Sequence, residues 1–338
     1  MAIVTLGIDL AKSVFAVHGV NALGKPELVR PEVRRAKLLD LIAKLPPCLI
    51  GMEACSGAHH WAREFQKFGH TVRIMAPKFV VPYRMSGKHG KNDAADAAAI
   101  CEAVTRPNMR FVPIKTIEQQ SQLFIHRAQQ GYVSERVALV NRMRGLLSEL
   151  GIVLPQSHKA FKQGVYQVLE DLPGPCNVVI GDMLSELSRL EQRIAINDRA
   201  IVELARKDTQ AQRLMQLRGV GPTTATAIVA SVGNGHDFDS GRQFSAWLGL
   251  VPRQNSSGGK ARLGRITKAG DSYLRTLLVL GARAMLMTAK NKNDPVSRWA
   301  LQLKERRGYG KAVVAIAAKN ARMCWAALRL GEGFRLPV

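Results

Sequence analysis

The fold of this chain follows from the stretch Val4-Thr5-Leu6-Gly7-Ile8-Asp9-Leu10-Ala11-Lys12. Aliphatic residues bounded by glycine favour a β-strand, so this stretch predicts a largely buried strand that ends near Asp9. A second apolar run, from Val14 to Val20, follows at hairpin distance. A carboxylate at the end of a buried strand costs a free energy on the order of several kcal/mol unless a cation or hydrogen bonds compensate. The sequence therefore predicts a compensating partner for Asp9.

The charge of the chain is strongly positive. Its 338 residues include 49 lysines and arginines against 26 aspartates and glutamates, a net charge of +23. The excess is uneven, because residues 206–338 hold 23 basic and 7 acidic residues whereas residues 1–205 hold 26 and 19. This balance favours nucleic acid as a polyanionic partner, and the C-terminal part is the stronger candidate for contacting phosphates. A merely solvated basic surface is the alternative.

The sequence argues against a membrane protein and against a secreted disulfide scaffold. No apolar run reaches the roughly 18–20 residues that a membrane span needs, and the N-terminus lacks the features of a signal peptide. The five cysteines show no CxxC pairing. We therefore expect a cytoplasmic protein with no membrane partner.

Residues 1–112 alternate strand and helix signals. After the first hairpin, strands are predicted over residues 27–33, 48–53 and 71–75, and helices over residues 34–45, 56–68 and 93–104. A hairpin followed by strands and helices in alternation predicts an α/β domain, in which helices cover a mixed sheet.

The remainder of the chain is predicted to be mainly helical. Long helices are expected over residues 119–150 and 177–206, and the second has apolar positions from Val179 and Met183 onward at coiled-coil-like spacing. We therefore assign residues 113–208 to a coiled-coil segment for dimerisation, with an ordinary helical subdomain as the alternative. Residues 209–338 are assigned to a separate, mainly α C-terminal domain.

Four acidic residues are notable for their positions. Asp9 and Glu53 end two predicted strands, while Asp93 and Asp96 share one face near the start of a predicted helix. Clustered carboxylates repel one another unless a cation binds, and two divalent ions about 4 Å apart can stabilise the attacking and leaving oxygens of a phosphoryl transfer. One interpretation is thus a nuclease-like metal site. The other is structural, with Asp93 as a helix N-cap and Glu53 as a strand-end residue.

A glycine-rich turn, Leu217-Arg218-Gly219-Val220-Gly221-Pro222, has the form of the turn in a helix-hairpin-helix motif. Gly219 and Gly221 allow a tight turn, and Pro222 suits the first turn of the following helix. Free N–H groups at such a helix start can bind a backbone phosphate without reading bases. A turn with no binding role is the alternative.

A serine- and glycine-rich loop, Ser256-Ser257-Gly258-Gly259-Lys260, lies in a basic segment. Its basic neighbours are Arg253, Arg262, Arg265 and Lys268. The loop is not a Walker A motif, because Ala261 stands where a serine or threonine would follow the lysine. It is expected to be flexible and to contact phosphates. A serine in it could attack a phosphate if its deprotonation were made easier, but on the residues alone a plain polar loop is the simpler interpretation.

Taken in order, these segments resemble the DEDD-type insertion-sequence transposases, relatives of the Piv site-specific DNA invertase. The N-terminal matching segments are Gly7-Ile8-Asp9-Leu10-Ala11-Lys12, Gly51-Met52-Glu53-Ala54-Cys55-Ser56-Gly57 and Lys91-Asn92-Asp93-Ala94-Ala95-Asp96. The C-terminal ones are Gly219-Val220-Gly221-Pro222-Thr223-Thr224-Ala225, Phe244-Ser245-Ala246-Trp247-Leu248-Gly249-Leu250-Val251-Pro252, Ser256-Ser257-Gly258-Gly259 and Ile266-Thr267-Lys268-Ala269-Gly270-Asp271-Ser272-Tyr273-Leu274-Arg275. The set spans nearly the whole chain, and its order is highly specific.

The resemblance implies a RuvC-like N-terminal domain of RNase H fold, a coiled coil and a C-terminal transposase domain. Asp9, Glu53, Asp93 and Asp96 match the family's DEDD residues, which bind Mg²⁺ or, alternatively, Mn²⁺. Ser257 matches the serine nucleophile that forms a covalent 5′-phosphoserine link to DNA, and alignment on the following glycine favours it over Ser256.

The resemblance also implies the partners. They are donor and target DNA, and a non-coding bridge RNA, encoded within the element, that pairs with both. The active site is expected to be composite across a homodimer, with two dimers in the synaptic complex, in the prokaryotic cytoplasm at the nucleoid.

Two other functions stay open on the sequence. The first is a metal-dependent RNase H-fold nuclease or junction resolvase that uses water as its nucleophile. The second is a non-catalytic RNA- or DNA-binding protein. An actin-like sugar kinase is set aside, because Leu10-Ala11-Lys12 stands where its phosphate loop would follow the first strand.

Overall fold

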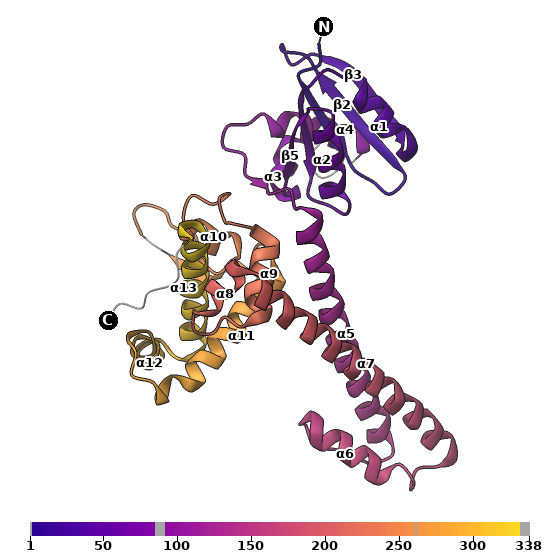
Figure 1. The fold of residues 1–338 in the computed structure, drawn as a ribbon, viewed down its shortest axis with the longest axis vertical. Coiled ribbons are helices and arrows are strands. Elements are labelled where there is room, and N and C mark those ends of the chain that lie inside the picture. Colours follow the sequence, from indigo (N-terminus) through magenta and orange to yellow (C-terminus); the bar gives the residue numbers. More distant parts are fainter. Residues whose placement is uncertain (1, 85–91, 261, 332–338) are drawn as a thin grey trace. The chain divides into compact units, whose positions relative to one another are not determined.

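The computed structural model describes residues 2–84, 92–260 and 262–331, and the chain divides after Thr116 into two compact units (Figure 1). Each unit has its own hydrophobic core. Lys91 and Ala261, which occur in the sequence motifs, lie outside the described residues. The two long central helices cluster with the C-terminal helices in the second unit, and the assignment of residues 113–208 to a separate segment stays a prediction.

The first unit is built on a six-stranded mixed sheet with the order β3-β2-β1-β4-β5-β6. Its strands are β1 (Thr5–Asp9), β2 (Val14–Val20), β3 (Pro26–Arg34), β4 (Leu49–Glu53), β5 (Thr71–Met75) and β6 (Phe111–Val112). The first strand lies centrally, because it pairs antiparallel with β2 and parallel with β4. The five strands predicted from aliphatic runs are therefore confirmed, whereas β6 is too short to give a periodic signal.

The helices of the first unit are α1 (Arg35–Ala43), α2 (Ala58–Lys67), α3 (Pro77–Val80), the 3-10 turn η1 (Val81–Tyr83) and α4 (Asp93–Val104). Two glycines of the sheet let α4 lie directly on it. A Cβ at Gly7 would lie 2.2 Å from the carbonyl oxygen of Ala97, and one at Gly51 would lie 2.8 Å from the Cβ of Val104. Any larger residue would force α4 away from β1 and β4. The glycines therefore hold the start of α4 near the strand ends that carry Asp9 and Glu53.

The second unit is mainly helical, as the sequence predicts. Its helices are α5 (Ile117–Glu149), α6 (His158–Val168), α7 (Gly174–Lys207), α8 (Thr209–Met215), α9 (Pro222–Val232), α10 (Gly241–Trp247), α11 (Ser272–Thr288), the 3-10 turn η2 (Ala289–Asn291), α12 (Pro295–Arg307) and α13 (Tyr309–Leu330). One short hairpin, β7 (Pro252–Gln254) and β8 (Leu263–Ile266), follows α10. Helices α5 and α7 pack side by side, and the main core lies among α8 to α13 (Figure 1).

The buried stripe of α7 differs from the predicted one at its start. Ile180 and Leu184 are 2% and 4% exposed, whereas Val179 is 47% exposed. The reason is α6, a helix that the sequence did not predict, because its Phe161 and Val165 join the same cluster. The first half of α7 therefore packs against two helices rather than one, and its stripe is rotated by one residue. The dimerising role of this segment stays a prediction.

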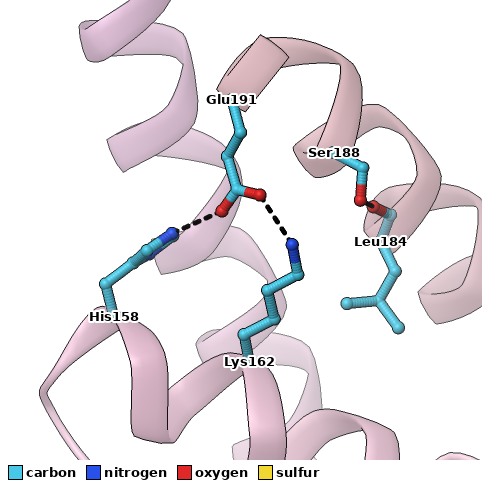
Figure 2. A network of polar contacts seen from close by, with 5 residues as sticks. All are labelled: His158, Lys162, Leu184, Ser188 and Glu191. Carbon is cyan, nitrogen blue, oxygen red and sulfur yellow. Dashed lines mark hydrogen bonds and ion pairs between the residues drawn. The ribbon is translucent and has the colours of Figure 1, made fainter. Parts of the chain in front are cut away.

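A network of polar contacts connects α6 to α7 (Figure 2). The carboxylate of Glu191 on α7 lies 2.7 Å from Nε2 of His158 and 2.6 Å from Nζ of Lys162, both on α6. Burial raises the pKa of Glu191, but the contacts with Lys162 and His158 outweigh it and leave that pKa below its ordinary value. The network therefore stabilises the charged carboxylate and the position of α6.

A buried histidine joins three helices of the second unit. His126 of α5 is fully buried, with Nε2 3.0 Å from the hydroxyl of Thr226 on α9 and Nδ1 3.0 Å from that of Tyr273 on α11. The Thr226 hydroxyl donates to the carbonyl of Pro222, so it accepts from Nε2–H, and Nδ1 then accepts from Tyr273. Burial lowers the pKa of His126 to about 4. The imidazole is therefore neutral and fully hydrogen-bonded.

This histidine predicts a pH-dependent stability. In the unfolded chain His126 binds a proton below its ordinary pKa of 6.5, whereas in the folded chain it does so only near pH 4. The contribution of neutral His126 to the free energy of unfolding is therefore fully present above pH 6.5 and is lost as the pH falls towards 4. The pKa difference corresponds to roughly 3 kcal/mol of unfolding free energy. Urea unfolding of wild type and His126→Gln across this range measures it. The variant retains every carboxylate and should lose less stability than wild type; equal losses would contradict the assignment.

Candidate active site

The ends of two neighbouring strands bring Asp9 and Glu53 together. The strands β1 and β4 are parallel, with Ile8 opposite Met52, so these last residues of the two strands stand side by side. Both charges act on the nearby Cys55: partial desolvation raises the pKa of its thiol, and the carboxylates of Asp9 and Glu53 raise it further. The structure therefore gathers two of the four predicted carboxylates at one edge of the sheet.

The other two carboxylates occupy the first turn of α4 in different environments. The N-cap of this helix is Asn92, whose Oδ1 accepts the N–H of Ala95 at 2.7 Å. The alternative role of Asp93 as the N-cap is therefore wrong, and Asp93 is an exposed first helical residue. Asp96 is 3% exposed, one turn further along the same helix.

Arg84 connects two of these carboxylates. Its Nε lies 2.7 Å from Oδ1 of Asp96, and its Nη2 lies 3.7 Å from Oε1 of Glu53. The Nε and Oδ1 atoms are close without hydrogen-bond alignment, so the contact is an ion pair. A buried carboxylate such as Asp96 needs a neighbouring cation, and the guanidinium supplies it. The sequence does not distinguish Arg84 from other basic residues nearby, because only the fold shows which one turns inward.

The donor chemistry of this cluster fits a hard divalent cation. All four side chains offer carboxylate oxygens, the ligands that Mg²⁺ prefers, and the guanidinium of Arg84 already stands as a cation between Glu53 and Asp96. In the present arrangement, no three carboxylate, imidazole or thiolate groups of the described residues are placed to hold a metal ion together. Arg84 is thus the cation that the described residues show beside Glu53 and Asp96.

The second unit presents Ser257 at the tip of the β7–β8 hairpin. The N–H of Lys260 donates to the carbonyl of Ser257 at 3.1 Å, and Gly258 and Gly259 have φ values of 55° and 74°. Two central residues with positive φ are the mark of a type I′ turn, which glycines adopt without strain. The serine loop is therefore the turn of a β-hairpin, with an exposed serine at its corner, and its flexibility stays a prediction.

The two adjacent serines have different environments. The hydroxyl of Ser256 accepts the backbone N–H of Arg262 at 3.1 Å and so helps to close the hairpin. Ser257 is exposed at the first position of the turn. The basic residues predicted to contact phosphates are exposed on or beside the same hairpin: Arg253, Lys260, Arg262, Arg265 and Lys268.

The base of the hairpin is fixed by close backbone contacts. A Cβ at Gly249 would lie 2.2 Å from the carbonyl oxygen of Ala269, and one at Gly270 would lie 1.8 Å from that of Trp247. Arg275 of α11 also donates to the carbonyl of Leu248 at 3.0 Å. Two of the family-like motifs thus meet here and hold the serine hairpin at one place on the helical unit.

The glycine-rich turn before α9 has two glycines with different roles. Gly219 has φ of 81°, and a Cβ on it would lie 2.6 Å from the carbonyl of Gly281, so it serves close packing against α11. Gly221 is the exposed N-cap of α9, with open space where a Cβ would be. Gly221 is therefore the better placed of the two to approach a phosphate, and the binding role of both remains a prediction.

The helices give no sign of a membrane segment. Within the parts of the chain that the structure describes, no helix combines the length and the apolarity that crossing a bilayer requires.

Comparison with known proteins gives consistent matches over both units. Residues 211–296 match the model of the Transposase IS116/IS110/IS902 family, and residues 6–152 match the DEDD transposase model of IS110 type. The chain is 47% identical over 328 residues to a probable family 20 transposase of Pseudomonas aeruginosa, covering 96% of each. It is 40% identical to the transposase for insertion sequence element IS1111A of Coxiella burnetii, covering 98% of this chain and 91% of that protein. It is 36% identical to the transposase for insertion sequence element IS1328 of Yersinia enterocolitica, covering 97% and 98%.

The contacts of Arg84 predict a link between the free energy of unfolding and the binding of a divalent metal ion. In Arg84→Gln the buried Asp96 loses its cation, so the metal-free variant should unfold with about 3 kcal/mol less free energy than wild type. A divalent ion then has no guanidinium to displace, so added Mg²⁺ should raise the melting temperature more in the variant. Thermal unfolding with and without MgCl₂ measures both effects.

The matched control is Arg110→Gln, which removes an exposed arginine from the same unit and should change neither quantity much. An equal Mg²⁺-induced shift in wild type and Arg84→Gln would show that Arg84 does not compete with the metal.

Proposed function

This chain belongs to the IS116/IS110/IS902 family of insertion-sequence transposases, and on that premise we propose that it cuts and rejoins DNA through a covalent 5′-phosphoserine intermediate on Ser257. Family membership makes the chain a DNA-processing enzyme whose substrate is DNA. The DEDD transposase domain also suggests dependence on a divalent metal. The identities of the nucleophile, the metal ion and the guide RNA are our proposals.

The observation that carries the proposal is the exposed position of Ser257 in the tight turn of a basic hairpin. A nucleophile that attacks duplex DNA has to project from the protein surface, and the type I′ turn places Ser257 at such a point. Cationic neighbours such as Arg253 and Arg262 can contact the phosphates on either side of the attacked one. The competing hydroxyl of Ser256 is engaged by the hairpin backbone, which favours Ser257.

The proposed reaction exchanges one phosphate ester for another. The Ser257 oxygen forms a bond to phosphorus as it loses its proton, and the bond from phosphorus to the 3′ oxygen breaks, leaving a protonated 3′ hydroxyl and the 5′ phosphate on serine. A 3′ hydroxyl of the second DNA then attacks the phosphoserine, and the serine oxygen recovers a proton. Each step makes one phosphate ester as it breaks another, so strand joining requires no ATP.

The carboxylates of the first unit have the role of holding the metal. We assign Asp9, Glu53, Asp93 and Asp96 as the residues that would bind Mg²⁺ or Mn²⁺. A divalent ion bound there would stabilise negative charge on the phosphate and make the serine easier to deprotonate. Arg84 keeps the buried part of this cluster neutralised, and it becomes available to a phosphate when it leaves Asp96.

The proposed partners follow from the same resemblance and from the charge. We propose that a bridge RNA encoded in the element pairs with donor and target DNA and selects both, and that the protein acts as a dimer, two of which form the synaptic complex at the nucleoid. The net charge of +23 supports an assembly with more than one nucleic acid. Exposed apolar side chains on the long helices, Phe124 at 66% and Ile196 at 56%, support a helical dimer contact.

A metal-dependent nuclease that uses water remains the second candidate, because the carboxylate cluster alone suits it. Substitution of Ser257 distinguishes the serine mechanism from the water mechanism. Substitution of Asp9 distinguishes both of these enzymes from a non-catalytic nucleic-acid-binding protein.

The covalent mechanism predicts distinct outcomes for the two serines. Ser257→Ala should abolish both the protein–DNA adduct and strand exchange while leaving DNA binding within about twofold, because the phosphate contacts come from basic side chains. Ser256→Ala is the matched control and should retain the adduct, since it loses only a backbone hydrogen bond near the turn. Denaturing gels with DNA labelled at the 5′ or 3′ side of the cut measure the adduct and its polarity.

Cleavage by Ser257→Ala at the wild-type rate would establish the water mechanism instead. Full activity of Asp9→Asn would argue against any metal-dependent chemistry at the carboxylate cluster.

A further inference from the structure

A groove between α12 and α13 lies outside all the residues assigned so far. Its volume is about 490 Å³, and it is lined by Trp299, Lys319, Arg322, Met323 and Ala326. Trp299 belongs to α12, and the other four recur along one face of α13 at the spacing of successive helical turns. This volume is in the range of about 300–1,000 Å³ that is typical of small-molecule sites.

The groove combines an aromatic ring with positive charge. The Nζ of Lys319 lies 4.3 Å from the centroid of the Trp299 ring, and the side chain of Arg322 is exposed. Residues 295–330, which include both helices, hold eight basic residues and one acidic residue, Glu305. Such a surface repels cations and favours a ligand that has both a flat apolar group and a negative charge.

We propose that this groove binds an unpaired nucleotide of a single-stranded nucleic acid, with its base on Trp299 and its phosphate at Lys319 and Arg322. Every base has an aromatic face, so stacking on a tryptophan requires no particular sequence. Bases in an intact duplex have both faces covered by their neighbours, which excludes them from this site. Met323 and Ala326 provide the apolar wall along which the base and sugar lie.

This site rests on the proposed function, in which nucleic acid is the partner, and it specifies single-stranded nucleic acid as the class that the groove binds. It does not depend on the carboxylates or on Ser257. An acidic peptide is the other occupant that the positive charge would attract, but it brings no flat aromatic group to stack on the half-buried Trp299 ring. The ring therefore distinguishes the two.

Fluorescence anisotropy with a labelled oligothymidylate of about 12 nucleotides tests the proposal on the full-length protein. Trp299→Leu and Arg322→Gln should each weaken this binding about 5- to 100-fold, and Trp299→Phe should weaken it less, because phenylalanine keeps an aromatic face. Binding of a duplex of the same length should change less than about twofold with Trp299→Leu, since stacking is not used there. Arg329→Gln is the matched control, because Arg329 is exposed on α13 outside the groove.

The opposite results would overturn the inference. Unchanged single-strand binding by Trp299→Leu and Arg322→Gln, with melting temperatures like that of wild type, would show that the groove is not the site. Capture of a polyglutamate peptide that Arg322→Gln abolishes and Trp299→Leu leaves unchanged, with oligothymidylate binding unchanged in both variants, would assign the groove to an acidic protein. Ser257→Ala should bind oligothymidylate like wild type, so failure of the groove and failure of the serine mechanism are separately visible.

Discussion

The architecture of the first unit depends on a backbone contact between α4 and β1 that only glycine permits. With no Cβ at Gly7, the carbonyl of Ala97 can approach the strand, and Gly51 gives the neighbouring strand the same freedom. This contact sets the height of α4 above the sheet and so the distance of Asp93 and Asp96 from Asp9 and Glu53. A cluster of carboxylates is electrostatically unfavourable, and the fold accommodates it by supplying a cation, Arg84, to the most buried member.

The chemistry that we propose is divided between two units with separate cores. The first unit carries the carboxylates, and the second carries Ser257 on a hairpin whose base is fixed by Gly249 and Gly270. Each half is locally ordered, since the carboxylates lie on strand ends and a helix start while the serine lies on a tight turn. The mechanism that we propose therefore depends on an assembly, with nucleic acid as its partner, that brings a serine hairpin to a carboxylate cluster.

The sequence predicted the elements well and the side-chain environments less well. The strands and α4 were predictable because aliphatic runs are separated by Gly and Pro, and because Asp93 begins a regular helix. The inward turn of Arg84 and the burial of Ile180 in place of Val179 were not, since each is decided by a tertiary neighbour. The sequence of the β7–β8 hairpin indicates a loop, because its strands are exposed and polar and lack the alternation that marks a half-buried strand.

We propose that the carboxylates of one subunit and the serine of another make one active site. The most direct measurement mixes Asp9→Asn with Ser257→Ala, two variants each inactive alone and tagged to differ in mass, and looks for the covalent DNA adduct. A composite site predicts that the adduct reappears in the mixture and only on the Asp9→Asn subunit, because that subunit keeps Ser257 while its partner keeps Asp9. No adduct in a mixture whose subunits are shown to associate would contradict the account.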